Sequence, residues 1–337
     1  MSNHLKRAPL WLIGAGPMAV SYGHVLRHLK MPFEVIGRGA TSAASFRKAV
    51  QVPVHEGGIE TQLAQSAAPE TAIVAVSLMQ LSQTTKTLIE AGTSKILLEK
   101  PAALTLAAIA ELTEFAAARG SEIYIAYNRR FNASTSAARQ LIEEDGGVRS
   151  FHFEFTEWSH KIETLPHPPE VLENWLFANS SHVIDLAFHL GGQPEKLSCH
   201  QAGGLSWHPS ASAFSGSGVT EQGALFSYQA DWEAPGRWGV EILTANRRLI
   251  LRPLEQLWIQ EKGSIAIHRQ EIDDSLDTDF KPGLCAEVQD FLRPQPNRLP
   301  SLQEHHQFAA NILQPIAGLG TVESPQQQAR KEKTTCF

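Results

Sequence analysis

The sequence is poor in cysteine, lacks long apolar runs and carries no excess of positive charge. Its three cysteines, Cys199, Cys285 and Cys336, are widely spaced among 337 residues, so neither a disulfide framework nor a metal finger is expected. No apolar segment reaches the roughly 20 residues that a transmembrane helix needs. The formal net charge of −6 disfavours nucleic acids and anionic membranes as partners. Unpaired thiols are typical of a reducing compartment, so we expect a cytoplasmic protein.

The first 125 residues alternate short apolar runs with helix-like segments. Alternation of strands and helices with short links is typical of parallel βαβ units in a doubly wound sheet. The strands are expected at 9–16, 33–39, 71–77, 95–100 and 121–127, and the helices between them at 18–29, 81–92 and 104–120.

From about residue 150 the pattern changes to short strands at turn-like spacing. In FHFEFTEW (151–158), Phe151, Phe153 and Phe155 alternate with polar residues, which predicts a half-buried strand. A series of such strands is typical of a mostly antiparallel sheet. Further strands are expected at 224–232, 238–245, 247–252, 255–260 and 264–268, with helices at 179–190 and 301–316. We therefore expect two domains, 1–125 and 126–325, and a polar tail, 326–337.

The segment GAGPMA (14–19) follows the first strand and fits the pattern G-x-G-x-x-A. Gly14 permits the tight turn, Gly16 lets the backbone approach a pyrophosphate, and Ala19 permits close packing of helix and strand. With Pro17 and Met18 in its first turn, the helix N-terminus favours negative charge. In this βαβ context the motif predicts a dinucleotide site, the alternative being a plain strand–helix turn.

The end of the second strand indicates which dinucleotide binds. NAD-binding domains present an acidic residue there to the adenosine ribose, whereas this chain has Arg38, Thr41 and Ser42. An arginine attracts a 2′-phosphate, and the two hydroxyls can donate hydrogen bonds to it. The pattern favours NADP(H), with NAD(H) second, unless Arg38 is only a solvated loop cation.

The stretch LLEKPAAL (97–104) ends an apolar strand in Glu99, Lys100 and Pro101. Ligands of doubly wound sheets bind beyond the carboxyl ends of the strands. Partial desolvation and a nearby cationic nicotinamide would lower the pKa of Lys100 and make it a usable acid or base. The alternative is a strand-end lysine in solvent.

Together, the glycine turn, the Glu99-Lys100-Pro101 tip and the following Tyr127-Asn128-Arg129 stretch resemble the glucose–fructose oxidoreductase / inositol dehydrogenase / MocA family. The resemblance implies a Rossmann domain followed by an α/β domain with an open, mostly antiparallel sheet. It also implies a homo-oligomer, a dimer or tetramer.

The same resemblance assigns candidate site residues. Lys100 is placed beside the nicotinamide and the reacting carbon, and Tyr127 beside the substrate. Ser77 and Leu78 stand where relatives commonly carry Pro-Asn-x-x-His, so only their backbone groups are expected to hold the cofactor. The other cofactor candidates are Glu99, Pro101, Asn128 and Arg129.

A second family signal lies in the segment NSSHVIDLAFHLGG (179–192). His182, Asp185 and His189 are spaced to share one helix face. The resemblance matches His182 to the catalytic histidine and Asp185 to a following carboxylate. Polyol dehydrogenases of the family often carry an aspartate four residues before that histidine, where this chain has Ala178. A metal site on this face is a minor alternative, because the two histidines lie seven residues apart; we expect none.

We expect acid–base work from Lys100 and His182, together with Asp185, and substrate contacts from these three, Tyr127 and Trp175. The loop before the helix adds pocket candidates His160, Lys161 and His167. The expected reaction is hydride transfer between a nicotinamide and a carbinol or carbonyl carbon of a sugar, a cyclitol or a sugar derivative.

Three alternatives remain for the function. One is a nucleotide-sugar or amino-sugar dehydrogenase, and another is a reductase of a non-sugar substrate such as a cyclic imine or tetrapyrrole. The third, from a different class, is a dinucleotide-sensing module without turnover, which would need neither Lys100 nor His182.

Overall fold

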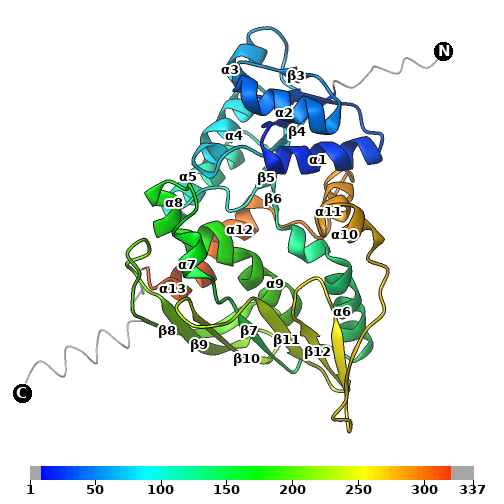
Figure 1. The fold of residues 1–337 in the computed structure, drawn as a ribbon, viewed down its shortest axis with the longest axis vertical. Coiled ribbons are helices and arrows are strands. Elements are labelled where there is room, and N and C mark those ends of the chain that lie inside the picture. The colour runs from blue at the N-terminus through cyan, green and yellow to red at the C-terminus, as the bar shows by residue number, and fades with distance from the viewer. Residues whose placement is uncertain (1–8, 320–337) are drawn as a thin grey trace, which may run out of the picture.

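The first domain of the computed structural model, which describes residues 9–319, is built on six parallel strands (Figure 1). The strands run in the order β3-β2-β1-β4-β5-β6, the doubly wound topology that the sequence predicts. Neighbouring β1 and β4 mark the point where the strand order reverses. The bounds are β1 Leu10–Ile13, β2 Phe33–Ile36, β3 Val54–His55, β4 Thr71–Val74, β5 Lys95–Glu99 and β6 Glu122–Ala126.

Helices cover both faces of this sheet, and its central strands are correspondingly apolar throughout. All four residues of β1, LWLI, are buried, as expected of a parallel strand that packs on both sides. The helices are α1 Pro17–His28, α2 Ala40–Val50, α3 Gly58–Leu63, α4 Leu81–Glu90 and α5 Leu106–Ala117.

The second domain contains an eight-stranded sheet in the order β14-β13-β12-β11-β7-β10-β9-β8. Among the described strand pairs of this second sheet, only β7–β10 is parallel, and the others are antiparallel. This confirms the predicted mostly antiparallel sheet. The bounds are β7 Ser150–Glu154, β8 Pro194–Ala202, β9 Ala213–Thr220, β10 Leu225–Asp231, β11 Gly239–Leu243, β12 Arg247–Leu251, β13 Trp258–Glu261 and β14 Ile267–Arg269.

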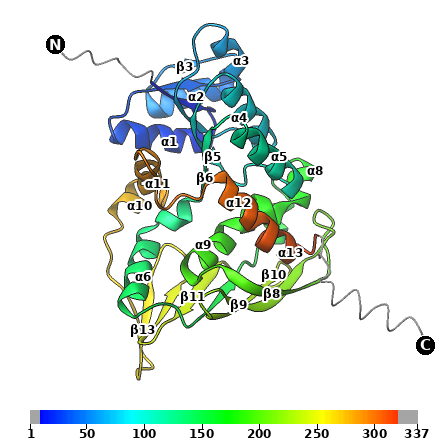
Figure 2. The same cartoon turned by 180° about the vertical axis from the view of Figure 1, so that it is seen from behind.

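One face of the second sheet packs against helices that point toward the first domain. Phe151 and Phe153 of β7 contact Phe188 of α9 (Ser181–Gly191), with ring centroids 5.7 and 5.6 Å apart. Figures 1 and 2 show α6 (Ala133–Glu144), α9 and α13 (Gln314–Ile316) on this face. Within residues 9–319, no helix covers the opposite face. The short helices α7 (Ser159–Ile162) and α8 (Pro169–Glu173) lie between the two sheets.

The end of the described chain returns to the first domain. Leu284, Val288 and Phe291 of α11 (Leu284–Phe291) share a core with Tyr22 and Leu26 of α1. Helix α12 (Leu302–Phe308) packs against α5 and β6. A π-helical turn, 309–313, joins α12 to α13, and α10 (Ser275–Asp279) precedes α11. These returning helices fix how the two sheets face each other across the site.

No helix among residues 9–319 combines the length and the apolar character needed to cross a membrane. The predicted polar tail and Cys336 lie outside the described residues.

Candidate active site

The turn between β1 and α1 has the geometry that a dinucleotide requires. Gly14 has φ +121°, and a Cβ at this position would lie 2.3 Å from the carbonyl oxygen of Ala75, so only glycine fits. At Gly16 the situation differs, because a Cβ there would meet no atom within 4 Å. Packing within the protein therefore does not demand glycine at this position, and the open space suits the close approach of a pyrophosphate.

The N-terminus of α1 is free to bind an anion. Gly16 is its N-cap residue, and no side chain caps the helix. The backbone N–H groups of Met18 and Ala19 in the first turn point along the axis toward the open space, where the helix dipole favours negative charge. These residues fit the pyrophosphate of a dinucleotide.

An adjoining cavity of about 340 Å³ suits the adenosine end. It is lined by residues from the ends of β1, β2 and β4, among them Gly14, Arg38, Met79 and Gln80. Val76 also lines it, so the wall is formed by residues that flank the predicted Ser77 and Leu78.

Arg38, Thr41 and Ser42 meet at the N-terminus of α2. The N-cap residue is Gly39, again without a side-chain cap. Arg38 and Thr41 are exposed, and the Ser42 hydroxyl donates to the carbonyl of Gly39 at 3.0 Å. A cation, two hydroxyls and backbone N–H groups without a side-chain cap thus lie within five residues at one helix N-terminus, a donor set that fits a 2′-phosphate.

Strand β5 delivers Glu99 and Lys100 to the space between the two sheets. The Tyr22 hydroxyl donates to Glu99 Oε1 at 2.8 Å, and the Lys100–Pro101 peptide bond is cis. Lys100 Nζ donates to the carbonyl oxygen of Ala178. Burial lowers the pKa of Lys100 to about 8, although the Glu99 carboxylate opposes this effect. Lys100 can therefore exchange a proton near neutral pH.

His182 lies in the first turn of α9, four residues beyond Ala178. Its ring packs between Tyr127 and Trp238, with centroid distances of 6.0 and 6.2 Å. Burial lowers the pKa of His182 well below its ordinary value, and the positive charge of Lys100 adds to this effect. The imidazole is therefore neutral at physiological pH and able to accept a proton.

Asp185 differs from its expected role as a free carboxylate. Its Oδ2 and Oδ1 accept hydrogen bonds from Arg130 Nε and Nη2 at 2.8 and 2.6 Å, and the side chain is buried. Burial by itself would lower the pKa of the Arg130 guanidinium. The negative charge and the hydrogen bonds of Asp185 have the larger combined effect, so this pKa is raised. Because the carboxylate is fully occupied, we assign Asp185 a role in holding α9 against residue 130.

Three other predicted residues are also engaged with the protein. Tyr127 is 0% exposed, and its hydroxyl lies 3.4 Å from His305 Nδ1, so it supports the His182 ring from behind. Asn128 Nδ2 donates to the carbonyl of Pro282 at 2.8 Å. Arg129 pairs with Glu255, and both line the pocket described next.

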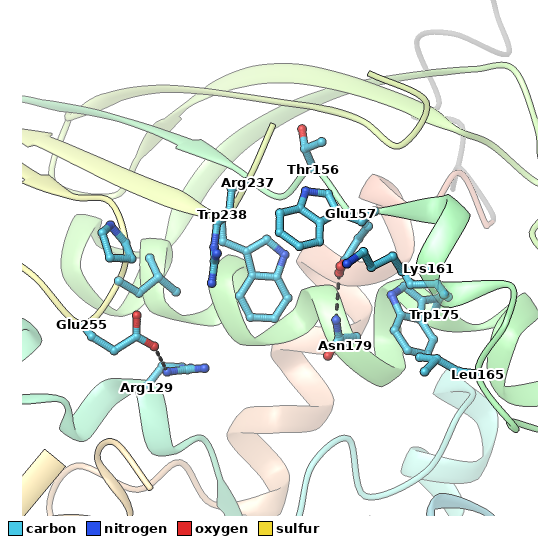
Figure 3. Close-up of a pocket in the computed structure, with 14 residues that line it drawn as sticks. Arg129, Thr156, Glu157, Lys161, Leu165, Trp175, Asn179, Arg237, Trp238 and Glu255 are labelled. Atoms are coloured by element: carbon cyan, nitrogen blue, oxygen red, sulfur yellow. Dashed lines mark hydrogen bonds and ion pairs between the residues drawn. The ribbon is translucent and has the colours of Figure 1, made fainter. Parts of the chain in front are cut away.

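A cavity of about 290 Å³ lies next to this part of the site (Figure 3). Lys100 and His182 do not line it, but Asn179, which directly follows Ala178, and Trp238, which packs on the His182 ring, do. Three tryptophans contribute to its wall: Trp175, Trp238 and Trp158. Trp175, predicted as a substrate contact, is 7% exposed, and Trp238 connects the cavity to the His182 ring. Lys161 also lines the cavity, whereas His160 and His167 do not. Aromatic walls with a few polar groups are typical of sites for small organic ligands.

Glu157 also lines this pocket, although no sequence motif marks it. Its Oε1 accepts hydrogen bonds from Asn179 Nδ2 at 3.0 Å and from the Ser180 hydroxyl at 2.8 Å. Asn179 and Ser180 directly follow Ala178, whose carbonyl contacts Lys100. Glu157 is 8% exposed, and burial raises its pKa to about 7 despite these two hydrogen bonds. Its negative charge in turn raises the pKa of Lys100.

The predicted face of His182, Asp185 and His189 does not form one open site. Asp185 is buried under Arg130, and the Nε2 atom of His189 is buried without a hydrogen-bond partner among residues 9–319. In the same part of the chain, no group of three or more His, Cys, Asp or Glu side chains could hold a metal ion.

Comparison with known proteins is consistent with this geometry. Residues 10–127 match the model of the oxidoreductase family with an NAD-binding Rossmann fold. The search of curated protein sequences gave no match.

Solved structures share the fold over nearly the whole chain at low sequence identity. Levoglucosan dehydrogenase in complex with NADH has a TM-score of 0.75 at 16% identity, covering 93% of this chain and 97% of its own. UDP-N-acetylglucosamine 3-dehydrogenase from Acidithiobacillus ferrooxidans has a TM-score of 0.69 at 16% identity, with coverages of 92% and 98%. An inositol dehydrogenase homologue from Azotobacter vinelandii, complexed with NADH and myo-inositol, has a TM-score of 0.68 at 15% identity, covering 93% of this chain and 96% of its own.

Proposed function

Through residues 10–127 this chain belongs to the GFO/IDH/MocA family of oxidoreductases with an NAD-binding Rossmann fold, and we propose that it is an NADP(H)-dependent enzyme acting on a CH–OH group. The substrate is a sugar, a cyclitol or a sugar derivative. Neighbours of the same fold that are named for levoglucosan and UDP-N-acetylglucosamine, or bound to myo-inositol, support this class.

The observation that carries the proposal is that the Lys100 amine reaches Ala178, four residues before His182, next to one pocket. Lys100 comes from the carboxyl end of β5 and His182 from α9 of the other domain, and the Lys100 amine contacts the carbonyl of Ala178. A dinucleotide-sensing module would need neither side chain. The two groups have the protonation behaviour that alcohol oxidation requires, a neutral imidazole and a lysine that titrates near pH 8.

When bound, the nicotinamide of the cofactor supplies the hydride acceptor or donor. The turn at Gly14 and Gly16 and the two helix N-termini would hold the dinucleotide. In the direction of oxidation, the neutral His182 accepts the hydroxyl proton as the carbonyl forms. Lys100 donates a hydrogen bond to the same oxygen and stabilises its developing negative charge. In reduction, the proton moves in the opposite direction.

Glu157 supplies the carboxyl group that is missing at Ala178. Glu157 follows β7 closely, and its carboxyl group is fixed by Asn179 and Ser180, the two residues directly after Ala178. Oε1 accepts from these two donors, and Glu157 lines the pocket, where the carboxyl group can meet a substrate hydroxyl. With a pKa of about 7, the group can take up or release a proton during turnover.

Two variants test the assignment directly. We expect Lys100→Met and His182→Ala to bind NADPH as the unmodified chain does, and to lose at least about a hundredfold in kcat, the usual contribution of a general acid or base. Turnover is followed as nicotinamide absorbance in a screen of polyols, sugars and sugar derivatives.

His306→Ala, a histidine of α12 outside the pocket, serves as the matched control. Full activity in both site variants would rule out the mechanism, while retained NADPH binding with no turnover on any substrate would favour the sensing module.

A further inference from the structure

The mouth of the substrate pocket is formed by an indole held in a fixed position. Trp158 is 43% exposed, which is unusual for so large an apolar side chain. Its Nε1 donates to the carbonyl of Gly236 at 3.0 Å, so the ring does not turn freely. Trp175, by contrast, is 7% exposed and lies at the inner end, near Asn179 (Figure 3).

Two cations flank this indole. Lys161 Nζ lies 5.4 Å from the Trp158 ring centroid, and the Arg237 guanidinium carbon lies 5.6 Å from it. Lys161 lies in α7, which begins directly after Trp158, and Arg237 comes from the turn before β11. Two segments about 80 residues apart thus bring positive charge to the same indole, in a chain whose net charge is −6.

Neither cation is neutralised by an acidic side chain. Among residues 9–319, no carboxylate oxygen lies within 4.0 Å of either cation. Two acids of this region have other partners for their charge. Glu255 pairs with Arg129, and Glu154 pairs with Arg252 while its Oε1 accepts the backbone N–H of Arg237 at 3.1 Å. Glu157 is held by Asn179 and Ser180. The pocket mouth is therefore positively charged and lacks an internal counter-ion.

We propose that this mouth binds a phosphate or diphosphate group carried by the sugar substrate, between Lys161 and Arg237. The proposal deepens the proposed function and rests on it. The cavity of about 290 Å³ takes the sugar ring at the inner end, near Trp175 and Asn179, and leaves the anion at the mouth. Arginine and lysine are the usual ligands of phosphate oxygens, and the exposed Trp158 offers a surface on which a nucleobase can stack.

Two sources of the phosphate are possible, a simple sugar phosphate and a nucleoside-diphosphate sugar. The test uses inorganic pyrophosphate, UDP and uridine as probes, with affinities measured by calorimetry on the full chain. Saturating NADPH blocks the pyrophosphate site at α1, and a parallel series without NADPH covers the case in which that cofactor does not bind.

We expect both anions to bind, and Lys161→Gln and Arg237→Gln each to weaken binding by roughly tenfold, the loss of one charged hydrogen bond. Arg248→Gln, a cation of β12 paired with Glu241 away from the pocket, should leave both affinities unchanged. UDP binding that exceeds pyrophosphate binding and falls in Trp158→Leu identifies a nucleoside-diphosphate sugar. Equal affinities that are insensitive to Trp158→Leu identify a sugar phosphate.

The proposal fails if neither anion binds, or if the affinities do not change in Lys161→Gln and Arg237→Gln, which would mean an adventitious ion only. Failure of the unmodified chain to bind NADPH is a result separate from the test of the anion site. It would count against the proposed function, while the series without NADPH still decides on the anion site.

Discussion

A carboxyl group that is buried beside a pocket costs stability once it ionises. The pKa of Glu157 rises from its ordinary 4.5 to about 7, chiefly because burial penalises the charged form. The folded chain therefore holds this proton more tightly than the unfolded chain does. Folded-state stability linked to Glu157 is present at low pH and is lost as the pH rises from about 4.5 through 7.

This cost gives a prediction that needs no substrate. Glutamine matches the neutral form of Glu157 and can still accept the hydrogen bonds of Asn179 and Ser180. We expect Glu157→Gln to raise the free energy of unfolding by roughly 3 kcal/mol at pH 8 and by little at pH 5, while turnover falls. Urea unfolding at both pH values measures the effect.

The exposed Glu195 on β8 supplies the control, and Glu195→Gln should change stability little at either pH. If Glu157→Gln destabilises the fold equally at both pH values, Glu157 is a structural residue whose charge is favourable, and its role in proton exchange is lost.

Sequence patterns find some of these residues and miss others for a physical reason. Lys100 and His182 stand in local motifs, and the structure brings Lys100 to Ala178, four residues before His182. Glu157 has no local signal, because its partners Asn179 and Ser180 lie 22 and 23 residues further along. The helical spacing of His182 and Asp185 is real, but it could not reveal that Arg130 occupies the carboxylate.

The turn between β1 and α1 separates what the fold needs from what the cofactor needs. Gly14 has a positive φ, and a Cβ atom there would collide with the Ala75 carbonyl, so the fold requires glycine at this position. Gly16 has φ −82° and open space around the Cβ position, so alanine fits there without strain. A cofactor pyrophosphate would occupy that space.

We therefore expect opposite behaviour from the same substitution at two positions. Gly16→Ala should keep the melting temperature of the cofactor-free chain and lose NADPH affinity by tenfold or more, whereas Gly14→Ala should lower the melting temperature. Thermal unfolding without cofactor and NADPH titration measure the two effects. Unchanged NADPH affinity in Gly16→Ala would mean that the space serves no dinucleotide.

The elements themselves follow from their hydrophobic patterns. Continuous apolar runs became the parallel strands, and the alternating Phe151, Phe153 and Phe155 became one face of β7 and its extension. The π-helical turn 176–180, which precedes α9, was not predicted. It carries Ala178, whose carbonyl contacts Lys100, and π-helical turns of this kind are often found at functional sites. A single-turn irregularity leaves no periodic trace in a sequence.

In the molecule as a whole, the site lies where the two sheets face each other. The doubly wound parallel sheet was predictable, because alternating strands and helices with short links allow few other folds. The return of α11 and α12 to the first domain was not, since an amphipathic helix does not indicate which apolar surface it will cover. This return closes the core around Tyr22 and Leu26, and so sets the distance between the cofactor end and the substrate end of the site.

The central claim is that this chain uses NADP(H), and one paired titration tests it most directly. The full chain and its Arg38→Asp variant are titrated with NADPH and with NADH, following tryptophan quenching and nicotinamide fluorescence. We predict that the unmodified chain binds NADPH more tightly than NADH. Arg38→Asp should weaken NADPH binding by at least roughly tenfold, since it replaces a cation with a repelling charge beside the 2′-phosphate. Unchanged NADPH affinity in Arg38→Asp, or preference of the unmodified chain for NADH, would contradict the assignment, and binding of neither dinucleotide would contradict the account as a whole.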